Sequence, residues 1–316
     1  LHGEGHSFPT RRSSDLAIQI ALDQGPNVEV IVVDDGSTDA SLEVVRRFDP
    51  RVRWFTERHG GACLARNVGL RHASADWVIF LDADDYLCPH HWRECAPLLE
   101  GATTNILFSA MNKIKNGKLV KRKSPPDTHD IERVVAYFLT SGFPSTVAMI
   151  WSKAFLLRVG GWAEWPRRHQ DAELVYRCLA AGARVRMTSR GGANYVHHTS
   201  PLRVSAANDP ATVHSCIDVL EAVVEAFDRG ERAIQAWNAY RWRWAYSLYR
   251  LAGRSGDKVA VARARRLWKQ FGGREHIGSL SHRIAVRLIG LSNKERLSVL
   301  SQDFRERLSP RGRAEG

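Results

Sequence analysis

The first two-thirds of the chain alternates short apolar runs with amphipathic segments. Residues 28–33 and 77–81 have the length and composition of buried strands, and each run stops at aspartates. Apolar residues at helical spacing follow each strand, in residues 38–49 and again in residues 61–70, where a glycine pair opens the helix. This alternation predicts an α/β fold built on a mostly parallel, doubly wound sheet.

The remaining elements are predicted less regularly. We expect the end of a helix at 17–22, strands at 52–56 and 105–112, and helices at 131–139, 151–159 and 172–181. A loop rich in Lys and Pro is expected over 114–130. From residue 210 onward two apolar stripes at helical spacing predict a helical appendage: Val213, Ile217, Leu220, Val224 and Phe227, then Trp237, Tyr240, Trp244 and Leu248.

Residues 1–16 show neither helical nor strand periodicity and differ in composition from the rest. Residues 7–16 resemble the translated read-through of a sequencing adapter, so we expect a non-native or disordered segment, with the genuine chain beginning near Ala17. The predicted organisation is therefore this segment, an α/β domain at 17–210 and a basic helical region at 211–316.

Composition excludes several classes of protein. The five cysteines form no C-x-x-C pair, which argues against a disulfide framework or structural zinc site and favours a reducing, cytoplasmic setting. The sequence has no apolar run of 18 residues, so an integral membrane protein is not expected.

The net charge of +12 is concentrated near the C-terminus, where residues 213–316 hold 20 basic and 11 acidic residues. Nucleic acid, anionic lipid and acidic polysaccharide would all suit this charge, and so would an ordinary solvated helix face. The sequence shows no nucleic-acid-binding signature, so that partner is not expected. The aromatic and basic stretch at 237–244 suits either the core or peripheral contact at the inner face of the plasma membrane.

Two acidic clusters follow the predicted strands, at Asp34-Asp35 and at 82–85. In extended backbone Asp82 and Asp84 would project to one face, which suits Mg²⁺ or Mn²⁺ bound with a diphosphate. An acidic turn that caps a helix is the alternative. Asp34 and Asp35 could accept hydrogen bonds from a base and a ribose, beside a tight turn at Gly36.

Several segments together resemble glycosyltransferase family 2 in order and spacing. They are residues 29–39 (EVIVVDDGSTD), 61–70 (GACLARNVGL), 77–85 (WVIFLDADD) and 151–164 (WSKAFLLRVGGWAE), followed by 170–174 (QDAEL). The resemblance covers about residues 17–205. It implies a GT-A type nucleotide-diphospho-sugar transferase sandwich that moves a sugar from a nucleotide-sugar with inversion at the anomeric carbon.

The resemblance also implies roles for particular residues. Asp34, Asp35, Gly36, Arg66, Asp82 and Asp84 would bind the nucleotide-sugar donor; Asp82 and Asp84 would hold the metal; and Asp171 would be the general base. His198 would join the metal or a phosphate, although a packing role is equally consistent and His197 is an alternative. Asp85 is a weaker candidate than Asp84.

The sequence departs from the family pattern in two places. Gln170 precedes Asp171 where the family usually has an acidic residue, which removes one carboxylate near the base. The family also begins with a strand that ends in a Pro-x-Tyr/Phe-Asn-like turn, and that pattern does not precede Ala17. We therefore expect the first strand to be missing and the nucleotide pocket to be incomplete.

The predicted activity is that of a metal-dependent hexosyl- or N-acetylhexosaminyltransferase with a UDP-sugar as the expected donor. A saccharide or lipid-linked acceptor in bacterial surface polysaccharide synthesis is implied by the resemblance. An aspartate-dependent phosphotransferase is disfavoured, because Asp84 is followed by Asp85 and Tyr86 rather than Thr or Val. The remaining alternative is a truncated or degenerate protein that binds a nucleotide or an anionic polymer without catalysis.

Overall fold

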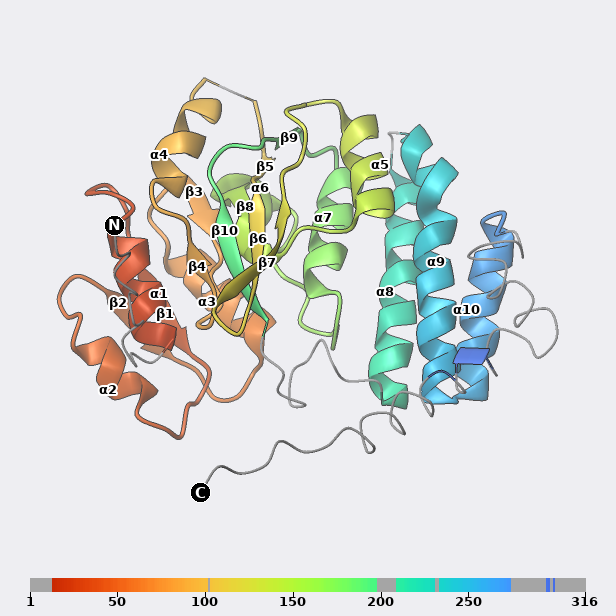
Figure 1. Cartoon of the computed structure of the whole chain (residues 1–316), viewed down its shortest axis with the longest axis horizontal. Helices are drawn as coiled ribbons and strands as arrows, with labels where there is room; N and C mark the ends of the chain where they lie inside the picture. Colours follow the sequence, from red (N-terminus) through yellow and green to blue (C-terminus); the bar gives the residue numbers. More distant parts are fainter. Residues whose placement is uncertain are drawn as a thin grey trace, which may run out of the picture. The chain divides into compact units, whose positions relative to one another are not determined.

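The computed structural model describes residues 13–101, 103–197, 209–230, 233–273, 294–295 and 298. Their contacts divide the chain into two units (Figure 1). The first contains the described residues of Leu1–Val134, Phe143–Glu164 and Arg177–Thr199, and the second those of Val135–Gly142, Trp165–Tyr176 and Ser200–Gly316.

The first unit alternates helices and strands. Its elements are α1 (Ser13–Leu22), β1 (Ile31–Asp34), α2 (Ser41–Arg46), β2 (Arg53–Thr56), α3 (Ala62–His72), β3 (Trp77–Ile79), β4 (Tyr86–Leu87), α4 (His91–Cys95), η1 (Ala96–Leu98), β5 (Ile106–Phe108), β6 (Met111–Lys115), β7 (Lys118–Lys123), η2 (Thr146–Ala148), β8 (Met149–Ser152), α6 (Lys153–Arg158), β9 (Val185–Met187) and β10 (Ala193–His197). Helices α5 (Ile131–Ser141) and α7 (Gln170–Ala180) contain residues of both units. The second unit adds α8 (Pro210–Arg229), α9 (Gln235–Ser255) and α10 (Lys258–Gln270).

The described strands form three sheets, ordered β1-β2, β4-β10-β6-β7 and β3-β8-β5-β9. The α/β class is confirmed, but the pairing is mixed rather than mostly parallel. Strands β1–β2, β10–β6 and β5–β9 are parallel, whereas β4–β10, β3–β8, β5–β8 and β6–β7 are antiparallel. Among the described pairs only β6–β7 is a hairpin, and the other antiparallel pairs join strands far apart in the sequence, which local strand and helix alternation cannot predict.

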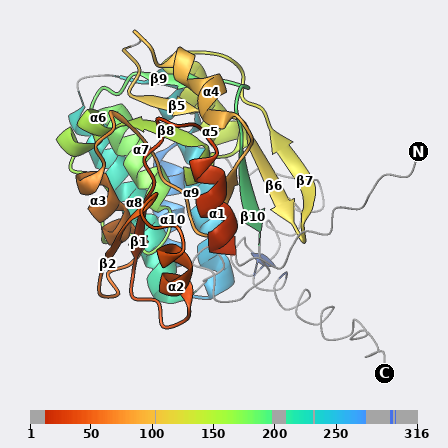
Figure 2. The ribbon, with the colours of Figure 1, turned by 90° about the vertical axis from the view of Figure 1, so that its left-hand side faces the viewer.

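Four predicted elements differ from the structure. The strand expected at 105–112 is two strands of different sheets, β5 and the start of β6. The segment expected to be a loop contains β7 and the end of β6, a hairpin around the Asn116-Gly117 turn (Figure 2). The helix expected at 151–159 is preceded by strand β8 and begins only at Lys153, because Ser152 caps it by accepting from the Phe155 amide. Helix α1 begins at Ser13, inside the segment set aside as non-native, while residues 1–12 lie outside the described part.

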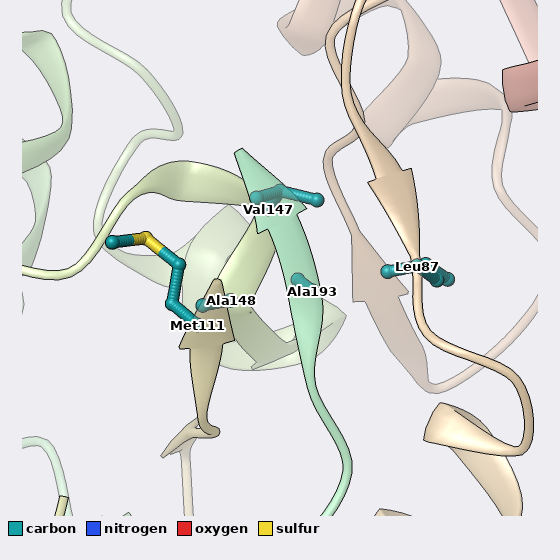
Figure 3. Close-up of a cluster of buried hydrophobic side chains, with 5 residues drawn as sticks. All are labelled: Leu87, Met111, Val147, Ala148 and Ala193. Carbon is teal, nitrogen blue, oxygen red and sulfur yellow. The ribbon is translucent and has the colours of Figure 1, made fainter. Parts of the chain in front are cut away.

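The core of the first unit lies under its sheets. One cluster joins Leu87 of β4, Met111 of β6, Val147 and Ala148 of η2, and Ala193 of β10 (Figure 3). A second cluster places Ile18 of α1 against Val45 and Val52. Among the described strands, β1 and β2 pair only with each other. Burial of this apolar surface therefore holds β1, α1 and α2 together.

The second unit is helical, as the two apolar stripes predict. Asp209 and Asp257 cap α8 and α10 by accepting from the Thr212 and Ala260 amides. Trp237 of α9 stacks on Phe227 of α8 with ring centroids 4.6 Å apart. Tyr240 is the exception to the second stripe, since it is exposed.

No helix among the described residues is long and apolar enough to cross a membrane. The five cysteines are all free, as expected from their spacing.

Candidate functional site

The acidic cluster at 82–85 forms a turn after strand β3. The Asp85 amide donates to the Asp82 carbonyl at 3.0 Å, so the backbone is not extended between Asp82 and Asp84 as the sequence argument assumed. Asp85 is 2% exposed, and its Oδ1 accepts a hydrogen bond from the Val196 amide of β10 at 2.8 Å. Asp85 therefore fastens this turn to the sheet, while Asp82 and Asp84 remain partly exposed.

Arg66 of helix α3 reaches this turn. Its guanidinium donates to Asp82 Oδ1 at 2.6 Å and lies 4.6 Å from the centroid of the Trp162 ring. The Arg66 side chain is 13% exposed and that of Asp82 is 45% exposed. A positive charge is thus fixed between an aromatic face and a carboxylate beside the acidic turn, where it can attract an anion.

Trp162 is itself held by Asn67, the next residue on α3. Asn67 Nδ2 donates to the Trp162 carbonyl at 2.9 Å and to Glu164 Oε1 at 3.1 Å, and its Oδ1 accepts from the Trp162 amide at 2.8 Å. Gly161 has φ +69°, and a Cβ there would lie 2.6 Å from Asn67 Oδ1. Only glycine therefore permits this close approach.

The predicted nucleotide-binding aspartates make local backbone contacts. Asp34 Oδ2 accepts from the amides of Gly36 and Ser37 at 3.2 and 3.1 Å. Asp35 accepts from the amides of Gly60 and Gly61, at 2.7 and 2.8 Å. The Asp35 carboxylate thus binds the free amides at the N-terminus of α3, where negative charge is favourable, and it links the end of β1 to α3.

Gly36 occupies a tight turn beside His59. Its φ is +82°, and a Cβ at this position would approach the His59 ring to 2.8 Å. The turn predicted at Gly36 is therefore present, and His59 packs directly over it.

The described residues contain no group of three His, Cys, Asp or Glu placed to hold a metal ion. Mg²⁺ and Mn²⁺ need only one or two protein carboxylates when a diphosphate and water supply the other ligands. The two partly exposed carboxylates of Asp82 and Asp84 fit that requirement, although Arg66 already occupies one oxygen of Asp82.

Asp171 lies in the first turn of α7, among residues of the second unit. Its Oδ1 accepts from the Ala172 amide at 2.9 Å, and the Gln170 side chain donates to the Pro166 carbonyl at 3.0 Å. His169 precedes them with its ring buried against Trp244, and burial lowers the pKa of His169 to about 4. His198 lies outside the described residues, whereas His197 ends β10.

The first unit thus brings together Asp82, Asp84 and Arg66, and separately Asp34, Asp35 and Gly36. Sequence reasoning missed Asn67, Trp162 and His59. Asn67 follows Arg66 within the helix segment quoted above, and Trp162 lies within the Gly160-Gly161-Trp162 stretch. Their partners are about 95 residues away in sequence, so no local pattern could connect them.

Solved structures of similar proteins identify the fold. A Staphylococcus aureus TarS fragment in complex with UDP-GlcNAc aligns with a TM-score of 0.64 over 92% of this chain and 89% of the other, at 17% identity. A mannosyltransferase from Pyrobaculum calidifontis in complex with GDP-Man and Mn²⁺ aligns with a TM-score of 0.53 over 93% and 81%, at 18% identity. The fold is that of the GT-A glycosyltransferases.

The sequence comparisons point to the same family as the motifs. Residues 16–157 match the sequence model described as Glycosyl transferase family 2. This part of the chain is thus similar to glycosyltransferase family 2, which confirms the resemblance noted in the sequence.

Two curated relatives match shorter segments. An uncharacterized glycosyltransferase of Haemophilus influenzae is 45% identical over 65 residues, which is 19% of this chain and 26% of the relative. The poly(ribitol-phosphate) beta-N-acetylglucosaminyltransferase TarS of Staphylococcus aureus is 31% identical over 104 residues, 32% of this chain and 18% of the relative. The chain thus spans about a quarter or less of the length of these relatives.

Proposed function

We propose that this protein is a nucleotide-sugar-dependent, inverting glycosyltransferase. The observation that carries the proposal is the acidic turn of Asp82 and Asp84 with Arg66 held beside it, inside the segment that matches family 2. The similar TarS structure holds UDP-GlcNAc, which supports a UDP-sugar as the first donor to test, and a hexosyl or N-acetylhexosaminyl group as the group transferred.

Each residue of the site has a part in the proposed reaction. Asp34, Asp35 and Gly36 shape the end of β1 for the nucleoside. Arg66 attracts the diphosphate and offsets the negative charge that grows on it as the bond to the anomeric carbon breaks. Asp82 and Asp84 would hold Mg²⁺ or Mn²⁺, which when bound supplies further positive charge to the departing nucleoside diphosphate.

Asp171 is the proposed general base. An acceptor hydroxyl attacks the anomeric carbon in line with the leaving group, and the Asp171 carboxylate takes the hydroxyl proton. One C–O bond forms as the other breaks, so the products are an inverted glycoside, the nucleoside diphosphate and a protonated Asp171. His197 or His198 stays a prediction for a further metal or phosphate contact.

The acceptor is proposed to be a saccharide or a lipid-linked saccharide of bacterial surface polysaccharide synthesis. The name of the TarS relative, which acts on a poly(ribitol-phosphate), supports an acceptor of that general kind. Contact of the basic C-terminal helices with an anionic membrane remains a prediction from their charge.

The proposal is tested by a screen of nucleotide-sugars that scores release of nucleoside diphosphate. We expect release from one donor with Mn²⁺ or Mg²⁺, loss with EDTA, and a loss of at least about 10²-fold in both Asp84→Ala and Asp171→Ala. Asp23→Ala, in the exposed residues after α1, is the matched control and should keep full activity. Nucleotide binding by calorimetry without turnover of any donor would instead favour the non-catalytic binding protein.

A further inference from the structure

The β6–β7 hairpin carries a strong, one-sided charge. Residues 111–123 contain five lysines and one arginine and no acidic residue. The strands pair around Asn116 and Gly117, whose φ angles of 50° and 70° are those that a two-residue hairpin turn requires. The charge therefore lies on an ordered sheet edge, beside β10 (Figure 2).

The strand register places these lysines opposite one another. Lys113 pairs with Lys121 and Lys115 with Lys118, and like charges in directly opposite positions destabilise a sheet. In the part of the chain that the structure describes, no carboxylate lies within ion-pair distance of these four side chains. Folding therefore brings these positive charges together without a counter-charge from the described residues.

Lys123 shows the effect of this crowding. Its Nζ donates to the Phe143 carbonyl at 3.1 Å. Burial lowers the pKa of Lys123, and the charges of Lys121 and Lys113 lower it further. An anion bound at the hairpin would relieve the same repulsion.

Lys115 and the acidic turn lie at the same end of the four-stranded sheet, on opposite sides of β10. His197 of β10 pairs with Lys115, and the neighbouring Val196 amide binds Asp85 at the end of the acidic turn. Adjacent strands are about 4.8 Å apart, so β6 runs about 10 Å from β4, which follows the acidic turn directly. A group bound by the lysines would therefore lie at the same end of the sheet as the acidic turn, where the donor's diphosphate is proposed to bind.

Two apolar residues near the hairpin turn, Ile114 and Leu119, are on the face opposite Lys113 and Lys115. Ile114 pairs with Leu119, and Ile114 alternates with Lys113 and Lys115 along β6, so it faces away from them. The exposed side chain of Leu119 is therefore not interleaved with the lysine pairs on β6. A phosphate-bearing chain lying along the lysines suits this arrangement better than insertion into a membrane does.

We propose that Lys113, Lys115, Lys118 and Lys121 bind phosphate groups of the acceptor, so that the acceptor of this enzyme is a phosphate-bearing polymer. The inference rests on the proposed transferase function, and it makes the hairpin a determinant of acceptor specificity. It gives a physical reason for the uncompensated lysine pairs, because acceptor phosphates supply the missing negative charge.

A binding experiment tests the hairpin without activity. Calorimetry measures binding of a glycerol phosphate oligomer, of inorganic tripolyphosphate and of a neutral maltooligosaccharide. We expect the two phosphate probes to bind, and the double variant Lys113→Gln/Lys121→Gln to bind them about tenfold more weakly. Lys258→Gln/Lys269→Gln, two exposed lysines of α10, removes the same charge and should bind like the wild type.

The stability of the variant gives an independent check. Removing one pair of opposed lysines should leave the melting temperature unchanged or raise it, so weaker binding cannot then be attributed to unfolding. Lys113→Arg/Lys121→Arg should restore binding. Equal binding by wild type and glutamine variant, or an equal loss in the α10 control, would overturn the proposal.

Kinetics separate this inference from the proposed function. In donor hydrolysis, where water replaces the acceptor, Lys113→Gln/Lys121→Gln should leave the KM for the nucleotide-sugar unchanged. A tenfold rise would assign the lysines to the donor and overturn the inference. Absence of turnover with every donor would refute the transferase function while the phosphate binding still stood. Hairpin-dependent binding only to phosphatidylglycerol vesicles would replace the acceptor by a membrane surface.

Discussion

Asn67 is the residue whose side chain does most to position the candidate site. All three of its hydrogen bonds go to Trp162 and Glu164, and Trp162 in turn packs under Arg66. Because Asn67 is buried, replacing its side-chain amide nitrogen by a carboxylate oxygen leaves the Trp162 carbonyl without a hydrogen-bond donor. The position of Arg66 beside Asp82 therefore depends on an amide that contacts neither of these two residues.

We expect Asn67→Asp to lower the free energy of unfolding by about 2 kcal/mol, because it loses a buried donor and brings a second carboxylate to Glu164. Urea unfolding followed by circular dichroism measures the change. Asn238→Asp, on the exposed face of α9, should stay within about 0.5 kcal/mol of the wild type. Equal stability of the two variants would show that the Asn67 contacts contribute nothing.

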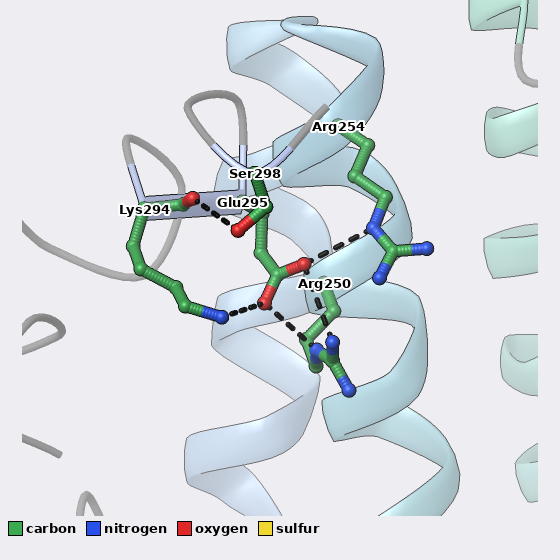
Figure 4. A network of polar contacts seen from close by, with 5 residues as sticks. All are labelled: Arg250, Arg254, Lys294, Glu295 and Ser298. Carbon is green, nitrogen blue, oxygen red and sulfur yellow. Dashed lines mark hydrogen bonds and ion pairs between the residues drawn. The ribbon is translucent and has the colours of Figure 1, made fainter. Parts of the chain in front are cut away.

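At the scale of elements, helix α9 is joined to residues 294–295 by the buried carboxylate of Glu295. Glu295 accepts from Arg250 at 2.9 Å, from Arg254 at 3.0 Å and from Lys294 at 3.2 Å (Figure 4). Burial alone would raise the pKa of Glu295, but the hydrogen bonds and charge of these three cations outweigh it and lower the pKa to about 2. The ionised Glu295 is stabilising because both of its carboxylate oxygens have cationic partners.

Glu295→Gln should lower stability at pH 7 by about 2 kcal/mol, since hydrogen bonds to charged groups are lost. The folded pKa is depressed, so the ionised carboxylate stabilises the protein above pH 4.5, and this contribution is lost as the pH falls towards 2. The variant should therefore lose less stability than the wild type between pH 4.5 and 3. Thermal unfolding across that range measures both effects.

The matched control is Glu225→Gln, which breaks an exposed ion pair with Arg229 one helical turn away. Exposed pairs of this kind contribute about 0.3–0.5 kcal/mol, so the control should be nearly neutral at both pH values. If Glu225→Gln were as costly as Glu295→Gln, burial would not be the reason for the effect.

At the scale of the whole molecule, each unit holds, among its described residues, a histidine whose pKa is lowered by burial. Burial lowers the pKa of His91 in the first unit and of His169 in the second to about 4. His91 Nδ1 accepts from the Gly192 amide at 2.9 Å, so the proton of the neutral ring is on Nε2. Protonation of either ring would place a charge in a poorly solvated position, and at His91 the charge of Glu94 offsets only part of this cost.

Because the unfolded chain protonates these histidines near pH 6.5 and the folded chain only near pH 4, stability should fall as the pH is lowered through that window, by up to about 3 kcal/mol for each histidine. Above pH 7 these two groups contribute no pH dependence. Melting temperatures at pH 7.5 and 5.0 measure the loss. His91→Asn keeps an acceptor for the Gly192 amide, and its melting temperature should fall less than that of the wild type between pH 7.5 and 5.0. An equal fall in both proteins would assign the pH dependence to other groups.

The sequence by itself determined the α/β class, the strand and helix positions around both acidic clusters, and the helical C-terminal region. Each of these follows from local periodicity and from turn and cap residues, which act over a few positions. The family resemblance was equally local, because it rests on short motifs in a fixed order. The free cysteines and the turn at Gly36 were predicted for the same reason.

Only the tertiary structure decided the mixed strand pairing, the β6–β7 hairpin and the partners of the candidate residues. Whether Asp85 binds a ligand or the Val196 amide depends on a strand 111 residues away. The opposition of Lys113 and Lys121 likewise depends on register rather than composition. Pairing and packing over long separations are set by the sum of many weak contacts, so they cannot be read from neighbouring residues alone.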